Sequence, residues 1–146
     1  MRAITFVLFA FLACTAAAED TSETAADPVF PTEVVEDLND FVWLKRPVVV
    51  FADSPNDPNF ARQMELLRAR RDDLAERDVV VLTDTDPSAK GPLRQKLRPR
   101  GFALVLLGKD GGVKLRKPKP WAVRELTRVI DKIPLRQQEI QDQLGQ

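Results

Sequence analysis

The sequence predicts an α/β domain built around a central four-stranded mixed sheet. Residues 47–52 and 79–83 are two short apolar runs rich in β-branched residues, and a long helical pattern separates them. A strand, a helix and a second strand form a βαβ unit, whose strands run parallel with a right-handed crossover. Further along, an Asp-Gly pair at Asp110 and Gly111 predicts a β-hairpin, which adds antiparallel strands.

The composition fits one ordinary domain and excludes several kinds of active site. The chain has 146 residues, with 22 basic and 22 acidic side chains and no formal net charge. This length leaves little room for two domains. The chain contains no His, no Tyr and one Cys. These absences exclude a Ser-His-Asp triad, a Cys-His pair and an imidazole metal cluster, and we expect no cofactor.

The first half of the predicted domain is the βαβ unit. Its two apolar runs do not alternate with polar residues, so we expect the strands to be buried on both faces. Asp57 is a favourable N-cap, and Pro58 suits the first position of a helix. The helix predicted over residues 59–77 places four apolar residues on one face: Phe60, Met64, Leu67 and Leu74.

The second half closes the sheet with a hairpin and a helix. We expect a loop, a short helix, two hairpin strands and a closing helix, at residues 84–91, 92–97, 103–107, 113–116 and 122–133. A type I′ turn at Asp110 and Gly111 joins the hairpin strands, and the predicted spatial order of the strands is 2-1-3-4. The domain then spans residues 34–136, and residues 137–146 form a polar tail or helix.

The N-terminus is typical of a secretory signal peptide over residues 1–18. A positive residue precedes an apolar run that is too short to span a membrane, and small residues follow it. We expect cleavage between Ala18 and Glu19, with export to the periplasm or the extracellular space. No other segment predicts a transmembrane helix. Residues 19–33 predict a disordered acidic leader, and Thr32 is a candidate N-cap for a helix that follows.

An alternative interpretation of the N-terminus is a bacterial lipoprotein. The four residues that end at Cys14 resemble a lipoprotein box, with Phe11 where an aliphatic residue is usual. A lipid on this cysteine would anchor the domain to a membrane. We favour cleavage after Ala18, which removes Cys14 and leaves no thiol in the mature chain.

The order of elements is that of a minimal thioredoxin-like domain, and several stretches resemble a known family. There are four such stretches. The first is Arg46-Pro47 together with the apolar run that follows it, and the others are residues 77–81, 108–116 and 130–139. From about residue 43 to 139 the chain resembles an uncharacterised family of exported bacterial domains, catalogued as a domain of unknown function (DUF4174). Related domains occur in vertebrate extracellular sushi-repeat and coiled-coil-domain proteins. The resemblance implies a thioredoxin-like fold and brings no activity, substrate or catalytic residue.

The redox elements of thioredoxin are missing from the matching positions. In thioredoxin a CxxC motif lies at the start of the long helix, where the helix terminus lowers the thiol pKa. The same turn here reads Pro55-Asn56-Asp57-Pro58. Ala103 occupies the position of the cis-proline that precedes the third strand of thioredoxin. We therefore expect no thiol-disulfide exchange, which requires a thiolate.

Four aspartates follow the first two strands and are candidate metal ligands. They are Asp53, Asp57, Asp84 and Asp86. Ligands of open α/β sheets bind beyond the carboxyl ends of strands, and carboxylates are good ligands for Mg²⁺ or Ca²⁺. This arrangement predicts, as an alternative, a metal-assisted hydrolase or transferase. The competing interpretation is two turns with N-capping aspartates, which need no metal.

The two halves of the chain carry opposite charge. Residues 19–89 contain 17 acidic and 7 basic side chains, whereas residues 90–136 contain 14 basic and 3 acidic ones. Such an asymmetry predicts an anion-binding face in the second half. This face consists of nine cations: Lys96, Arg98, Arg100, Lys109, Lys114, Arg116, Lys117, Lys119 and Arg136. Four of them are the candidate site residues: Lys109, Lys114, Arg116 and Arg136. The alternative is that the two halves neutralise each other across the fold, or that each charge is simply solvated.

We therefore expect an exported domain that binds an anionic ligand or an envelope protein through its basic face and carries out no catalysis. An anionic glycan, a lipid headgroup or an acidic protein suits an exported protein better than nucleic acid. The metal-assisted enzyme remains the alternative at this stage.

Overall fold

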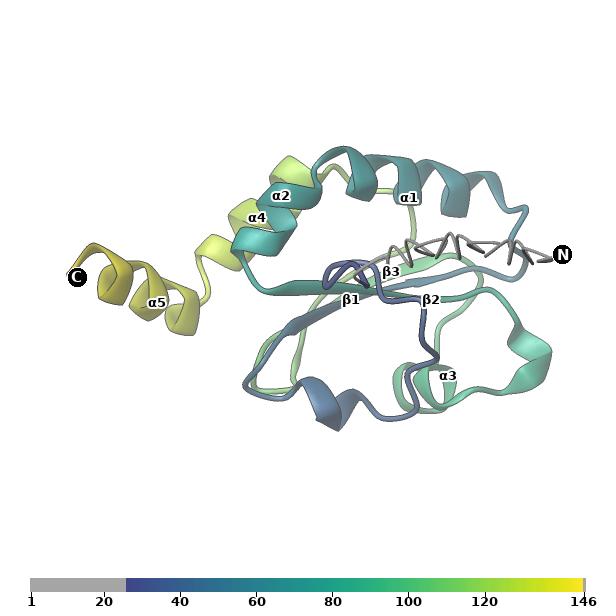
Figure 1. Cartoon of the computed structure of the whole chain (residues 1–146). Coiled ribbons are helices and arrows are strands. Elements are labelled where there is room, and N and C mark those ends of the chain that lie inside the picture. The colour runs from purple at the N-terminus through teal and green to yellow at the C-terminus, as the bar shows by residue number, and fades with distance from the viewer. Residues whose placement is uncertain (1–25, 146) are drawn as a thin grey trace, which may run out of the picture.

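The computed structural model describes residues 26–145, in which helices cover both faces of one mixed sheet (Figure 1). The helices on one face are α1 (Pro58–Ala69), α2 (Arg71–Glu76) and α4 (Val123–Asp131). The other face carries the 3₁₀ turn η1 (Leu38–Phe41) and the short helix α3 (Pro92–Leu97). A second 3₁₀ turn, η2 (Pro87–Ala89), precedes α3, and α5 (Pro134–Leu144) extends away from the sheet. No described helix is both long and apolar enough to cross a membrane.

The sheet has the predicted strand order, β2-β1-β3-β4. The strands are β1 (Arg46–Phe51), β2 (Val79–Asp84), β3 (Ala103–Leu107) and β4 (Val113–Lys117). The two strands of the βαβ unit are parallel, with Val48 opposite Val81, and β3 is antiparallel to both β1 and β4. This confirms the predicted α/β, thioredoxin-like fold with a mixed four-stranded sheet.

The apolar runs of β1 and β3 are continuous because both of their faces are buried. Every residue of β1 and of β3 is buried. Val48, Val50 and Leu104 pack with helices α1, α2 and α4 on one face. Val49 and Phe51 pack on the other face with three leucines from η1 and α3: Leu38, Leu93 and Leu97.

The helix predicted over residues 59–77 is interrupted at Arg70. The backbone of this residue leaves the helical region, with φ −122° and ψ 35°, and it separates α1 from α2. The predicted N-cap is confirmed, since the Asp57 carboxylate accepts from the N–H of Asn59 at 2.8 Å. Between Leu67 and Leu74 no side chain is buried, so no buried apolar packing favours a continuous helix through this turn.

The hairpin forms where it was predicted, but with a different turn. A type I′ turn needs positive φ at both central residues, whereas only Gly111 of the loop has it, at +82°. The N–H of Gly108 donates to the carbonyl of Gly112, so the loop is longer than two residues. The Asp110 carboxylate accepts from the N–H of Gly112 at 3.0 Å, which stabilises Asp110 with negative φ.

The N-terminal segment is more ordered than predicted where it is described. Val29 is buried and its carbonyl accepts from the N–H of Val81, so packing begins within the predicted disordered leader. Thr32 caps no helix; Asp37 instead caps η1 through the N–H of Asn39. The predicted signal peptide, with Cys14 and the Ala18–Glu19 cleavage site, lies outside the described residues.

Candidate anion-binding site

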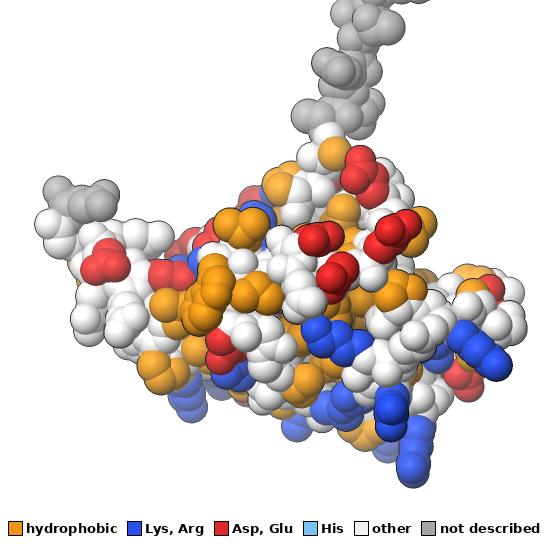
Figure 2. All heavy atoms as spheres, turned by 90° about the horizontal axis from the view of Figure 1, so that it is seen from below, with side chains coloured by type: hydrophobic (Ala, Val, Ile, Leu, Met, Phe, Trp, Pro, Cys, Tyr) orange, Lys and Arg blue, Asp and Glu red, His pale blue; other side chains and the backbone are white. Residues whose placement is uncertain are grey.

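A basic pocket lies where the C-terminal end of α3 meets the open edge of the hairpin. It has a volume of about 480 Å³. Its walls are four cationic and four apolar residues: Arg98, Arg100, Arg116, Lys117, Leu97, Phe102, Ala103 and Pro118. Viewed from the side of α3, Lys and Arg gather along one part of this face, and Asp and Glu gather on the opposite part (Figure 2).

The loop from α3 to β3 presents two of the four cations. Arg98 ends α3 with its backbone in the left-handed region, at φ 47° and ψ 60°. A side chain there costs about 1–2 kcal/mol relative to right-handed backbone, so glycine is the usual occupant. Pro99 and Gly101 follow in the loop that leads into β3. Gly101 also has a left-handed backbone, with φ +60°. The loop therefore carries Arg98 and Arg100 as exposed side chains on a constrained backbone.

Strand β4 supplies the other two cations. The hairpin register places Lys117 opposite Leu104 and Arg116 opposite Val105, so both lie beside the start of β3. Arg116 donates from Nη2 to the carbonyl of Leu97 at 2.8 Å, which ties its guanidinium to the end of α3. Lys117 lies over the ring of Trp121, with Nζ 4.7 Å from the ring centroid.

These four cations have no acidic partner in the described chain. None of Arg98, Arg100, Arg116 and Lys117 forms an ion pair with a carboxylate of residues 26–145. Arginine forks match the oxygens of phosphate, sulfate and carboxylate groups. The apolar residues beside them offer contact to a less polar part of a ligand. Among the described residues, no acid, His, Cys or Ser lines the pocket.

A comparison with protein-family models places the chain in a family. The model described as "Domain of unknown function (DUF4174)" matches residues 37–139, more than half of the chain. The chain belongs to the DUF4174 family. This agrees with the resemblance seen in the sequence. No curated protein matches the chain.

Solved structures similar to this DUF4174 domain are peroxiredoxins of the thioredoxin fold. The reduced 2-Cys peroxiredoxin of Plasmodium vivax is 17% identical, with a TM-score of 0.56, over 69% of this chain and 84% of that chain. Plasmodium yoelii Prx1a is 18% identical, with a TM-score of 0.52, over 68% of this chain and 79% of that chain. At this identity the likeness shows the fold alone.

The redox turn of this fold is occupied differently in the DUF4174 domain. The chain has one cysteine, Cys14, which lies outside the described residues. In the turn between β1 and α1, the Ser54 hydroxyl accepts from the N–H of Asn56, and the Asp57 carboxylate caps the helix. The helix terminus that would stabilise a thiolate is therefore already bonded to a carboxylate. The absence of thiol chemistry stays a prediction.

Two of the predicted anion-binding residues lie instead in an internal ion-pair network. Lys109 donates to Asp78 at 2.8 Å and to Glu139 at 2.7 Å. Arg136 is 3% exposed and lies 3.4 Å from Glu139. The buried Arg46, at the start of β1, donates to the same carboxylate at 3.1 Å. The Arg136 guanidinium also lies 3.6 Å from Asp131 of α4 and 3.8 Å from Glu76 of α2. Lys109 and Arg136 thus join segments of the fold, as expected if the two halves neutralise each other.

The network holds Glu139 in its charged form. Burial opposes the charge, but hydrogen bonds from Lys109 and Arg46 outweigh it and lower the pKa of Glu139 from 4.5 to about 2. A hydrogen bond from Arg77 also lowers the pKa of Asp131, at the end of α4. The stretches that carry the family resemblance, around Arg46, Asp78, Lys109 and Glu139, therefore meet at one end of the sheet.

Only one of the four predicted anion-binding residues lines the basic pocket. Arg116 does, whereas Lys114 pairs with Asp110 within the hairpin at 2.9 Å and lowers the pKa of that aspartate. Arg98, Arg100 and Lys117, which the sequence also placed on the predicted basic face, line the pocket with Arg116. The register of the hairpin shows why these cations lie together. Counting outward from the turn places residues 116–118 beside the loop that enters β3.

The four aspartates of the metal alternative do not assemble into a site. Asp57 caps α1, Asp86 caps η2, and Asp84 pairs with Arg94 at 2.9 Å. Asp53 lies beside Gly101. Within the part of the chain that the structure describes, no group of three or more Asp, Glu, His or Cys is placed to hold a metal ion. Asp57, Asp84 and Asp86 accept backbone hydrogen bonds in turns or caps, as the competing interpretation predicts for these three.

Proposed function

We propose that the protein is a non-catalytic binding module, and that its ligand is an anion held in the basic pocket. The observation that carries this proposal is the set of four cations around one hollow without an acidic partner in the described chain. The other three candidate site residues, Lys109, Lys114 and Arg136, are neutralised by carboxylates and contribute less. The pocket is therefore the part of the surface best suited to a negative group.

The chemistry of the pocket favours a phosphate or sulfate ester with an apolar portion. Two or more guanidinium groups can bind several oxygens of such a group at once. A carboxylate has only two oxygens and therefore accepts fewer of these hydrogen bonds. Phe102 and Leu97 are 7% and 6% exposed, and they form an apolar floor beside the cations. An anionic glycan or a lipid headgroup of the cell envelope has this composition.

The binding site is tested by reversing one charge of the pocket. We expect Arg100→Glu to weaken the binding of inorganic pyrophosphate, measured by titration calorimetry at low salt, by about tenfold, the loss of one charge-assisted contact. Arg124→Glu is the matched control, because it makes the same charge change on an exposed residue of α4, in the opposite layer. Affinity should also fall as salt is added. If both variants lost the same pyrophosphate affinity, the loss would come from the change in net charge, and the proposed binding site would be wrong.

A second variant separates binding from folding. Arg98→Gly removes a cation and places glycine at a left-handed position, so we expect weaker pyrophosphate binding with stability unchanged or raised by about 1 kcal/mol. Sulfated disaccharides and vesicles of anionic phospholipid, titrated in the same way, distinguish the two ligand sources. If neither these probes nor pyrophosphate bind the wild-type protein, the proposed function is wrong.

We further propose that the protein is exported, and that it acts in the periplasm or outside the cell. The apolar run and the small residues before Glu19 support this. Sequencing the N-terminus of the protein recovered from cells tests it. We expect the mature chain to start at Glu19. A lipid-modified Cys14 at the N-terminus would instead establish a lipoprotein, and an intact Met1 in the cytosol would contradict export.

A further inference from the structure

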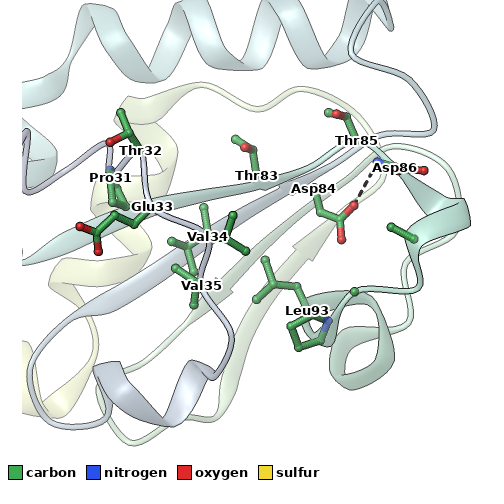
Figure 3. A pocket seen from close by; sticks show the side chains of 14 residues that line it. Pro31, Thr32, Glu33, Val34, Val35, Thr83, Asp84, Thr85, Asp86 and Leu93 are labelled. Carbon is green, nitrogen blue, oxygen red and sulfur yellow. Dashed lines mark hydrogen bonds between the residues drawn. The ribbon is translucent and has the colours of Figure 1, made fainter.

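An acidic groove lies at the edge of the sheet formed by β2, away from the basic pocket. It has a volume of about 360 Å³. One wall is the N-terminal segment from Pro31 to Val35, and the other is formed by Leu93 and its neighbours at the start of α3 (Figure 3). Residues Thr83 to Asp86, at the end of β2, lie between these walls.

The edge of β2 is left partly unpaired at this groove. In a strand, alternate residues direct their backbone groups to opposite sides. The carbonyls of Asp78 and Asp84 accept from the β1 side, through the N–H groups of Arg46 and Ala52. The N–H of Val81 points the other way and donates to Val29 at 2.7 Å. The next outward residue, Thr83, makes no outward backbone hydrogen bond to any described residue.

The sequence explains why the N-terminal segment stops covering this edge. Proline has no N–H, so Pro31 has no hydrogen bond to offer to the strand. After Val29 the segment leaves β2 and becomes a wall of the groove. An unpaired strand edge is a template for another extended segment. The groove is therefore open at the point where one more strand would pair.

The charge around the groove selects the kind of segment that would pair. Among residues 26–145, no Lys or Arg lines it, and none lines the adjoining hollow of about 400 Å³ that shares residues 31 and 33–35. Glu33 lines both hollows, and Glu36 and Asp40 line the second. The side chain of Val34 is exposed at 88% and offers apolar contact. Figure 2 shows acidic side chains gathered on this side of the face.

We propose that this groove binds an extended, positively charged peptide segment of a partner protein, which adds to the edge of β2 as a strand. Backbone hydrogen bonds to Thr83 give the affinity, and basic side chains of the peptide face the carboxylates around the N-terminal segment. This site is separate from the basic pocket, so it holds whether or not the anion site does.

Synthetic peptides test both parts of the proposal. The probe is a six-residue peptide of alternating Lys and Val, and its binding to the full-length protein is followed by titration calorimetry. A Glu-Val peptide of the same length tests charge, and a Lys-Val peptide with N-methylated backbone tests strand pairing at constant charge. We expect binding of the first peptide alone. Equal binding of the N-methylated peptide would overturn the proposal, because it would leave only charge attraction.

Two substitutions at Thr83 form a matched pair. Proline is tolerated where an edge residue directs its N–H outward, so Thr83→Pro removes one outward donor and keeps the bonds to β1. We expect Thr83→Pro to weaken the Lys-Val peptide roughly three- to tenfold, the effect of one hydrogen bond. Thr83→Val keeps the N–H and should bind as the wild type does. Should Thr83→Pro fail to fold, the N-methylated peptide still tests strand pairing, because it is used with the wild-type protein.

Hydrogen exchange identifies the occupant. Peptide binding should slow exchange of the Thr83 amide and leave that of Arg98 unchanged. Glu33→Lys should weaken the Lys-Val peptide roughly two- to fivefold, as expected for an exposed charge. If Thr83 becomes protected in concentrated protein without peptide, the occupant is a second copy of this chain and the partner proposed here is wrong. An unprotected Thr83 in the peptide complex would also overturn the proposal.

Discussion

Replacing Glu139 by alanine is expected to lower the free energy of unfolding by about 3–5 kcal/mol, the range for breaking a buried ion pair from one side. The Glu139 carboxylate accepts from Arg46, Lys109 and Arg136. Two of these three cations, Arg46 and Arg136, are 0% and 3% exposed, so the substitution leaves two buried guanidinium groups without this carboxylate. Urea denaturation followed by circular dichroism measures the loss.

Asp142→Ala is the matched control for this variant. It removes an acidic side chain from the same helix, where Asp142 is exposed and has no described ion-pair partner. We expect its effect to stay within about 0.5 kcal/mol. The stability loss of Glu139→Gln should lie between those of Glu139→Ala and Asp142→Ala, because glutamine keeps an acceptor oxygen but lacks the charge. A loss for Glu139→Ala as small as that of the control would show that the buried Arg46 has another route to neutralisation.

The same carboxylate gives the stability a defined pH dependence. The pKa of Glu139 is lowered from 4.5 to about 2 in the folded state, so the unfolded chain binds this proton first. Its contribution is complete above pH 4.5 and disappears as the pH falls toward 2. The displacement corresponds to about 3 kcal/mol, which the wild type should lose over this window in urea titrations. The curve of Glu139→Gln should be flatter over the same window.

The sheet could be predicted from the sequence because its signals are local. The two apolar runs of the βαβ unit are unbroken because their strands are buried on both faces, and the Asp-Gly pair fixed the place of the hairpin. The break at Arg70 and the exact turn at Gly111 were missed, since each depends on tertiary contacts or side-chain bonding that no periodicity carries.

The ion-pair network could not be predicted in the same way. The sequence indicated two halves of opposite charge and a possible neutralisation between them. It did not show that Lys109 takes part, because its partners Asp78 and Glu139 become its neighbours only once the sheet and α5 are in place. Arg136 and Glu139 lie three residues apart on α5, but the contacts of Arg136 with Asp131 and Glu76 also depend on the tertiary fold. The sequence placed the four cations of the basic pocket on one basic face. That they line the same pocket depends on the register of the hairpin, which brings Arg116 to the end of α3.

Arg94→Ala is expected to cost about 3–5 kcal/mol as well, for the same reason at the opposite end of the sheet. The Arg94 guanidinium donates to the carboxylate of Asp84 and to the carbonyls of Ala52 and Asp84, and it lies 5.5 Å from the centroid of the Phe51 ring. The side chains of Arg94 and Asp84 are 10% and 13% exposed. Without Arg94, the largely buried carboxylate of Asp84 loses its charged partner, and the carbonyl of Ala52 loses the guanidinium donor.

A double-mutant cycle isolates the interaction between Arg94 and Asp84 from the other contacts of Arg94. Arg94→Ala with Asp84→Asn should cost less than the sum of the single changes, because the neutral amide no longer leaves a charge without a partner. Arg62→Ala is the control, since Arg62 forms an exposed ion pair with Glu65 and should cost less than about 1 kcal/mol. Additive effects would contradict the coupling.

The Arg94 variant also connects stability to the basic pocket. Arg94 ties α3 to the ends of β1 and β2, and the end of the same helix positions Leu97 and Arg98. In variant protein that remains folded, we expect pyrophosphate affinity to fall although Arg94 does not line the pocket. Arg94→Lys should retain the charge but not the fork of donors, and should therefore recover only part of the stability and affinity. Full recovery by lysine would show that charge alone, rather than the three-acceptor geometry, holds α3 in place.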